Sequence, residues 1–163
     1  MNFAKHGAWL FILGIFCLID GDVVGSLATA RAGNHPQPFL EQAGSAEVQL
    51  ITADELKTRM AKNEPLTIVD VRSTNSYIES GDKIKGAIHV KLRRLRSRLA
   101  SPPLKTVPRD RETITYCACP SDQASIEAAK VLMAAGFKRV RVLKGGWLGW
   151  LKTNGPVEPR PKG

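Results

Sequence analysis

Short apolar runs alternate with stretches of helical spacing through most of the chain after residue 47. Runs that are rich in aliphatic and β-branched residues and bounded by Gly, Pro or polar positions predict strands. Five such runs occur, at 48–51, 66–71, 87–90, 113–117 and 140–143. Strands that alternate with helices favour an α/β fold, with a mostly parallel five-stranded sheet and helices on both of its faces.

Helices are predicted between these strands, at 52–61, 92–99, 122–135 and in a turn after Gly145. Thr52 with Glu55 three residues later forms a capping box that opens the first of them. The stretch that carries Tyr77 and the residues from Gly81 to Gly86 is predicted as a loop. The segment 157–163, which is rich in proline, is predicted as an irregular tail.

The N-terminal segment has the layout of an export signal. Its apolar run from Ala8 to Ile19 is too short to span a bilayer and suits a signal-peptide core. Small residues follow and offer cleavage after Ala30 or Ala32. We expect an exported protein of the bacterial periplasm, or one anchored to the membrane if this segment stays uncleaved. The predicted organisation is a signal peptide at 1–32, a linker at 33–47, one domain at 48–156 and the tail at 157–163.

Composition limits the kinds of partner. The 163-residue chain carries 24 Lys and Arg against 15 Asp and Glu, a formal net charge of +9. Anionic partners are therefore favoured, but no basic tail or aromatic-interleaved basic patch points to nucleic acid. Three cysteines are too few for a disulfide-stapled scaffold, and no further Cys or His lies at metal-ligand spacing. No metal is therefore expected. Trp147 and Trp150 are interpreted as packing residues, so no cofactor is expected either.

Two cysteines lie where a parallel α/β sheet usually presents its chemistry. Cys117 ends a predicted strand and Cys119 precedes a helix that Ser121 or Asp122 can cap. Free N–H groups and the positive end of the helix dipole favour thiolate over thiol at such a place. Cys117 and Cys119 are the candidate catalytic residues. Substrate binding is expected from the rest of the loop, which is Ala118, Pro120, Ser121, Asp122 and Gln123. Alternatively, Cys117 is only a small buried hydrophobe.

The ordered set of motifs resembles the rhodanese-like (thiosulfate sulfurtransferase) family, over roughly 48–156. The residues that carry the resemblance are Asp70-Val71-Arg72, Tyr77, Gly81, Gly86-Ala87-Ile88, Tyr116-Cys117, Ala128-Ala129, Leu132, Gly136-Phe137, Gly145-Gly146-Trp147 and Trp150. The family implies a loop cysteine that takes the outer sulfur of thiosulfate or a related donor as a persulfide. The sulfur then passes to cyanide or a thiol. Implied partners are a small anionic sulfur donor, such an acceptor and a possible protein sulfur acceptor.

The loop departs from the family pattern of cysteine, two residues, glycine, one residue, arginine and serine. Neither that glycine nor that arginine occurs between Cys117 and Ser125. Strand position favours Cys117 as nucleophile, whereas the spacing to Ser125 favours Cys119. We prefer Cys117, because loops absorb insertions more easily than buried strands absorb a slide, with Cys119 as a resolving or second sulfur-carrying thiol. A disulfide between them would close a very small ring and is not expected.

Asp70 and Arg72 are expected to lie outside the reacting groups and to fix the loops at the strand ends by polar contacts.

The leading hypothesis is an exported single-domain sulfurtransferase. The missing arginine motivates an alternative, a non-catalytic sulfur-relay or protein-binding module of the same fold. A phosphatase, which some relatives of this fold are, is disfavoured because no arginine in the loop can grip phosphate.

Overall fold

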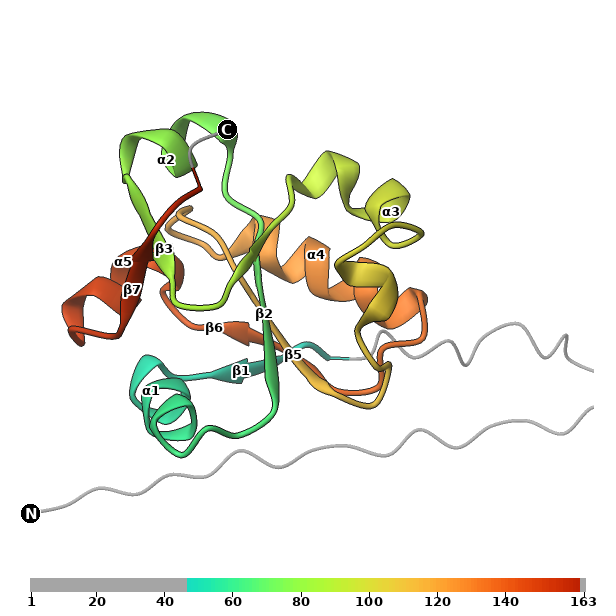
Figure 1. Cartoon of the computed structure of the whole chain (residues 1–163), viewed down its shortest axis with the longest axis horizontal. Coiled ribbons are helices and arrows are strands. Elements are labelled where there is room, and N and C mark those ends of the chain that lie inside the picture. The colour runs from blue at the N-terminus through green and yellow to red at the C-terminus, as the bar shows by residue number, and fades with distance from the viewer. Residues whose placement is uncertain (1–46, 162–163) are drawn as a thin grey trace, which may run out of the picture. The chain divides into compact units, whose positions relative to one another are not determined.

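The computed structural model describes residues 47–161, and the predicted signal peptide and almost all of the predicted linker lie outside them. A five-stranded sheet runs through the described part, with strand order β1-β6-β5-β2-β4 and every neighbouring pair parallel (Figure 1). Its strands are β1 (Gln49–Ile51), β2 (Leu66–Asp70), β4 (Ile88–His89), β5 (Glu112–Tyr116) and β6 (Val140–Leu143). The predicted fold class is confirmed, and β5 occupies the centre of the sheet.

Helices cover both faces of this sheet. They are α1 (Ala53–Ala61), α2 (Thr74–Glu79), α3 (Leu95–Arg98), α4 (Gln123–Ala134) and α5 (Gly146–Lys152), with short 3-10 turns at Leu92–Arg94 and Leu104–Thr106. Leu95 of α3 and Leu132 of α4 belong to one buried cluster, on one face. Leu56 of α1 and Trp150 of α5 belong to the other cluster. Alternate residues of the strands feed the two clusters, as the two-residue period of a strand requires.

Local signals explain the start of α1. The hydroxyl of Thr52 accepts the backbone N–H of Glu55 at 3.1 Å, as the capping motif predicts. The reciprocal half of the predicted capping box is absent, because the carboxylate of Glu55 instead accepts two hydrogen bonds from Arg141 of β6. A distant ion pair has therefore replaced a local hydrogen bond.

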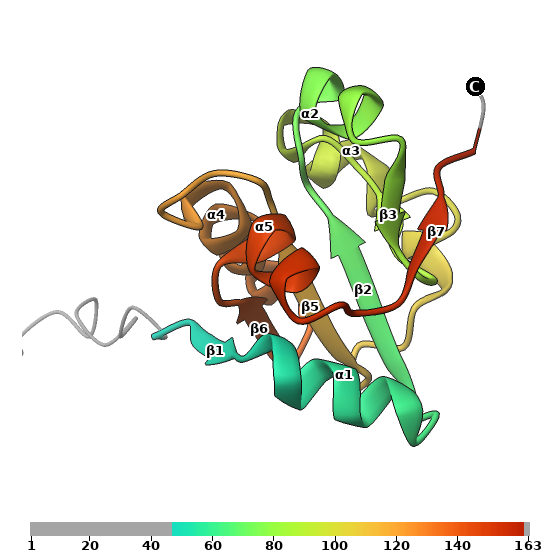
Figure 2. The same ribbon diagram turned by 90° about the vertical axis from the view of Figure 1, so that its left-hand side faces the viewer.

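Two segments differ from the sequence prediction. The stretch predicted as a loop contains α2 and strand β3 (Asp82–Ile84), and the predicted irregular tail contains strand β7 (Val157–Pro159). These strands pair antiparallel, with Lys83 opposite Glu158, and lie side by side in Figure 2. Lys83 forms an ion pair with Glu158 and donates to the carbonyl of Ala87 at 2.8 Å. Such a pairing depends on residues far apart in the chain, so no local pattern reveals it.

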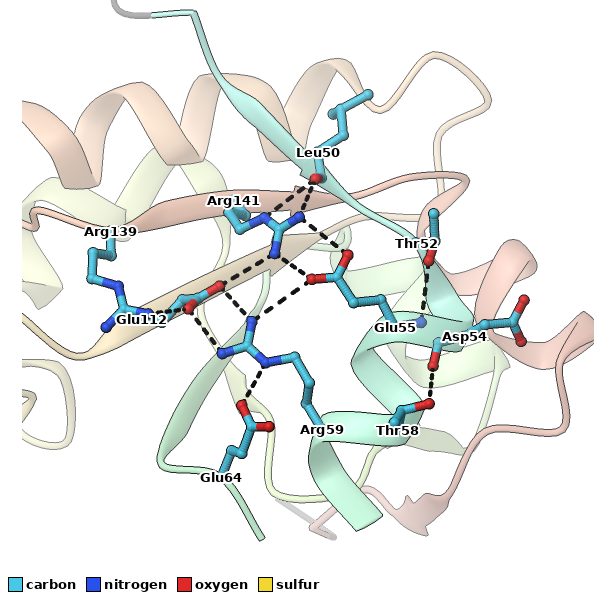
Figure 3. Close-up of polar contacts among 10 residues, drawn as sticks. All are labelled: Leu50, Thr52, Asp54, Glu55, Thr58, Arg59, Glu64, Glu112, Arg139 and Arg141. Atoms are coloured by element: carbon cyan, nitrogen blue, oxygen red, sulfur yellow. Dashed lines mark hydrogen bonds and ion pairs between the residues drawn. The ribbon is translucent and has the colours of Figure 1, made fainter. Parts of the chain in front are cut away.

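An ionic network ties α1 to the amino ends of β5 and β6 (Figure 3). The carboxylate of Glu112, the first residue of β5, accepts two hydrogen bonds from Arg59 and one from Arg139. Arg59 also bonds Glu64, and Arg141 bonds Glu55. This network lies at the opposite end of β5 from the cysteines. None of the helices within residues 47–161 is long and apolar enough to cross a membrane.

Candidate active site

The cysteine loop leaves the carboxyl end of the central strand and leads into α4. Cys117 follows β5 directly, is only 2% exposed and belongs to a hydrophobic cluster. Cys119 is partly exposed. The carbonyl of Cys117 accepts the N–H of Trp147 at 2.7 Å, which ties the loop to the first turn of α5. Both cysteines contact the same hydrophobic cluster, but Cys117 is buried within it and Cys119 is only partly buried against it.

The two cysteines form a disulfide, with their Cα atoms 5.7 Å apart. Our expectation that the small ring would prevent this bond is wrong. Residues two apart in extended backbone project to the same side, and the bend at Ala118 brings the Cα atoms within the ordinary disulfide range. The loop therefore holds both sulfur atoms within bonding distance of each other.

Donors from the loop point at the sulfur of Cys117. The backbone N–H of Cys119 lies 3.4 Å from Sγ, and the hydroxyl of buried Ser125 lies 3.6 Å from it. The same hydroxyl donates its one hydrogen to the carbonyl of Asp122 at 2.7 Å, so the amide of Cys119 is the main hydrogen-bond donor to Sγ. With the positive end of the 12-residue helix α4 nearby, this donor stabilises negative charge on Sγ of Cys117.

Asp122 has a role that its sequence position does not suggest. Asp122 is the N-cap residue of α4, which was one of the two predicted alternatives, but it adopts a left-handed conformation at φ 53° and its side chain makes no capping hydrogen bond. One oxygen of the Asp122 carboxylate instead accepts the N–H of Gly145 at 2.8 Å, which joins the cysteine loop to the start of α5. The left-handed backbone turns this side chain away from its own helix and toward its neighbour.

The other predicted substrate-binding residues surround the disulfide in different ways. Ala118 packs against the cluster that contains Trp147 and Trp150. Pro120, Ser121 and Gln123 are exposed, and the amide of Gln123 donates to Glu127 along α4. The structure thus brings Pro120 and Ser121 to the surface beside Cys119, whereas Ala118 is only partly buried against that cluster.

Asp70 and Arg72 form a buried polar cluster at the end of β2. The Arg72 guanidinium donates to both oxygens of Asp70, to the hydroxyl of Ser80 and to the carbonyl of Asp82. The hydroxyl of Tyr116, the residue before Cys117, donates to Asp70 at 2.7 Å. These contacts join β2, β5 and the segment from α2 to β3, so the pair fixes the strand ends around the loop.

The electrostatics of this cluster keep Asp70 ionised. Burial by itself would raise the pKa of the carboxyl, but contacts with His89, Arg72 and Tyr116 outweigh burial and hold the pKa below its usual range. For Tyr116, burial and the neighbouring Asp70 charge raise the pKa of the phenol, which therefore stays protonated and keeps its hydrogen bond. His89 stacks on Tyr77 with ring centroids 3.7 Å apart. Its Nδ1 also lies 3.7 Å from an oxygen of Asp70, so His89 belongs to the same polar cluster.

Sequence reasoning missed two features of the site. Gly146 has φ +47°, and a Cβ at this position would lie 2.2 Å from the carbonyl oxygen of Cys117, so only glycine lets α5 approach the loop. A hollow of about 490 Å³ beside the start of α4 is lined by Val71, Arg72, Ser73, Thr74, Asn75, Lys91, Leu92, Arg93 and Ala124. The pair Gly145-Gly146 was a sequence signal for the close approach of α5 to the loop, but no local pattern predicts the hollow.

Comparison with known proteins agrees with this geometry. Residues 52–153 match the Rhodanese-like domain family. The chain is 30% identical over 110 residues to a protein from Allochromatium vinosum named Sulfurtransferase, which covers 68% of this chain and 94% of that protein.

Similar folds occur among solved structures. The Alr3790 protein from Anabaena sp. is 32% identical, with a TM-score of 0.57 and coverage of 68% of this chain and 82% of that one. A Rhodopseudomonas palustris protein of unknown function, described as a possible tyrosine phosphatase, is 25% identical with a TM-score of 0.55, covering 68% and 85%.

Proposed function

Since the chain belongs to the rhodanese-like domain family, we propose that it is a sulfurtransferase that carries sulfane sulfur on a cysteine persulfide of the 117–119 loop. A loop thiolate attacks the outer sulfur of thiosulfate or a related donor. The sulfur–sulfur bond of the donor breaks, and sulfite leaves with its electron pair. Attack by cyanide or a thiolate on the outer sulfur of the persulfide then gives thiocyanate or a new persulfide and restores the cysteine.

The observation that carries this proposal is the position of two sulfur atoms between the central strand and the start of α4. Backbone N–H groups at this place stabilise the attacking thiolate and the charge that develops on the leaving group. No arginine occurs from Cys117 to Ser125, so the loop itself offers an anionic donor amides rather than a guanidinium. Lys91 and Arg93, which line the hollow beside α4, supply the nearby positive charge.

Because the disulfide occupies both sulfur atoms, the proposed reaction begins only after reduction of the loop. The expected donor is a small anion, which the formal net charge of +9 favours. The proposed place of action is the periplasm, because the N-terminal segment resembles an export signal.

A non-catalytic module of the same fold is the second candidate. Two observations favour it, the missing loop arginine and the disulfide that leaves no free thiol at the site. A phosphatase is disfavoured, because phosphate is gripped bidentately by arginine and the loop has none.

The experiment uses the reduced and desalted protein, incubated with thiosulfate and measured by intact mass. We expect the reduced loop to take one sulfur atom from the donor, seen as an added sulfur atom mapped to the loop or as released sulfide, and thiocyanate when cyanide is present. The control is the double variant Cys117→Ser/Cys119→Ser, which should gain nothing. A parent protein that gains no sulfur and releases neither sulfide nor thiocyanate with thiosulfate, polysulfide or an organic persulfide would favour the non-catalytic module.

A further inference from the structure

The two cysteines differ in accessibility and in charge stabilisation. Cys117 is 2% exposed and packs among residues of the core, whereas Cys119 is partly exposed. The amide of Cys119 points at Sγ of Cys117 and favours its thiolate. A soluble donor therefore meets Cys119 first, while Sγ of Cys117 lies beneath it, within reach of the Cys119 amide.

We propose that Cys119, and not the Cys117 that strand position favours, carries the incoming sulfur, and that Cys117 then displaces it as hydrosulfide, with closure of the loop disulfide. This inference rests on the proposed function and deepens it, because it names the thiol that receives the sulfur, the product and the co-substrate. The product is free sulfide, and the co-substrate is a dithiol that reopens the disulfide.

The chemistry balances in three steps. The Cys119 thiolate takes the outer sulfur of thiosulfate and releases sulfite. The Cys117 thiolate then attacks Sγ of Cys119, the bond from Sγ to the outer sulfur breaks, and hydrosulfide leaves with the electron pair. Finally, a dithiol reduces the Cys117–Cys119 disulfide and becomes a disulfide itself. The dithiol thereby returns the two electrons that the loop lost in the second step.

The geometry supports this order of roles. The disulfide shows that Sγ of Cys117 reaches Sγ of Cys119 without movement of the fold. Hydrosulfide leaves from the partly exposed residue, on the side of solvent. With the roles reversed, the donor would have to reach Cys117, which is 2% exposed, and hydrosulfide would have to leave from it.

The experiment compares the parent with Cys117→Ser and Cys119→Ser after reduction with dithiothreitol, removal of the reductant and addition of thiosulfate. The parent should release sulfide in amounts that match the disulfide formed. Cys117→Ser should hold a stable extra sulfur, release only background sulfide and still give thiocyanate with cyanide. Cys119→Ser should gain no sulfur. Circular dichroism melting checks that each variant is folded, and the measurement on the parent needs no variant.

The outcomes separate the two proposals. A parent that keeps its extra sulfur and releases no sulfide overturns this inference and leaves the proposed function intact. Sulfur on Cys119→Ser but not on Cys117→Ser overturns the assignment of roles. If the parent releases no sulfide, and neither the parent nor either variant gains sulfur or gives thiocyanate, the proposed function itself fails.

Discussion

The two ends of the central strand β5 both gather polar groups, but they use them differently. At the amino end, Arg59, Arg139 and Arg141 surround Glu112, and two hollows of about 450 and 500 Å³ open beside them. Each guanidinium is paired, because Arg59 also contacts Glu64 and Arg141 contacts Glu55. At the carboxyl end the loop has no arginine, yet it holds two sulfur atoms and an amide directed at one of them.

This difference shows that positive charge alone does not identify a site for an anion. The amino end has the arginines, but their charge already serves carboxylates that hold α1 to the sheet. The loop at the carboxyl end has no arginine, but its backbone donors and nucleophiles are placed where parallel sheets bind ligands. Changes at the amino end should therefore affect stability alone, and changes around the loop should affect sulfur transfer as well.

The largest expected effect is that of Asp70→Asn, which leaves the buried guanidinium of Arg72 without its counter-charge. Breaking a buried ion pair costs roughly 3–5 kcal/mol, so urea unfolding should show a loss of that order. Asp54→Asn, which changes an exposed carboxylate in the first turn of α1, should cost less than about 1 kcal/mol. Equal losses for the two variants would contradict the structural role of the Asp70–Arg72 pair.

Gly146→Ala should disturb the loop itself. Its positive φ and the clash with the Cys117 carbonyl together should cost about 2–4 kcal/mol and slow sulfur loading of the reduced protein. Gly86→Ala is the matched control, since it has φ +77° but open space at the Cβ, and should cost only about 1–2 kcal/mol. If both variants load sulfur at the parent rate, the contact between α5 and the loop does not position the cysteines.

Glu112→Gln tests the amino end. It removes the charge that Arg59 and Arg139 share and should lower the free energy of unfolding by roughly 1–3 kcal/mol. The rate of sulfur loading per folded molecule should stay at the parent value, because this network is remote from the cysteines. Glu55→Gln, in a more exposed pair with Arg141, should cost about 1 kcal/mol or less. Slower sulfur loading in Glu112→Gln would contradict the claim that changes at the amino end of β5 affect stability alone.

The last prediction concerns how the loss of unfolding free energy in Glu112→Gln depends on pH. Hydrogen bonds from Arg59 outweigh burial and hold the pKa of Glu112 below its usual range. A carboxyl with a lowered folded-state pKa stabilises the protein fully above its unfolded-state pKa, and this contribution disappears as the pH falls through the folded-state value. The unfolding curves of parent and variant should therefore converge in acid. A difference that stays constant from neutral pH into acid would contradict an ionised Glu112.

Most of the fold could be predicted because its signals are local. Strand β6 falls on the predicted residues 140–143, and α4 lies within the predicted 122–135. The sequence also placed Cys117 and Cys119 between a strand and a helix, and that placement is the core of the candidate site. Both predictions depend on apolar runs and residue spacings that lie within a single helix or strand, so they can be read from the sequence.

The remaining features depend on contacts between distant residues, which only the tertiary structure decides. The sequence by itself determined the α/β class, the places of the main strands along the chain and the position of the two cysteines between a strand and a helix. The packed structure decided which cysteine is buried, which carboxylate serves Gly145 and that β7 pairs with β3. The physical reason is that exposure, ion pairing and strand pairing are set by neighbours in space, and those neighbours lie tens of residues away along the chain.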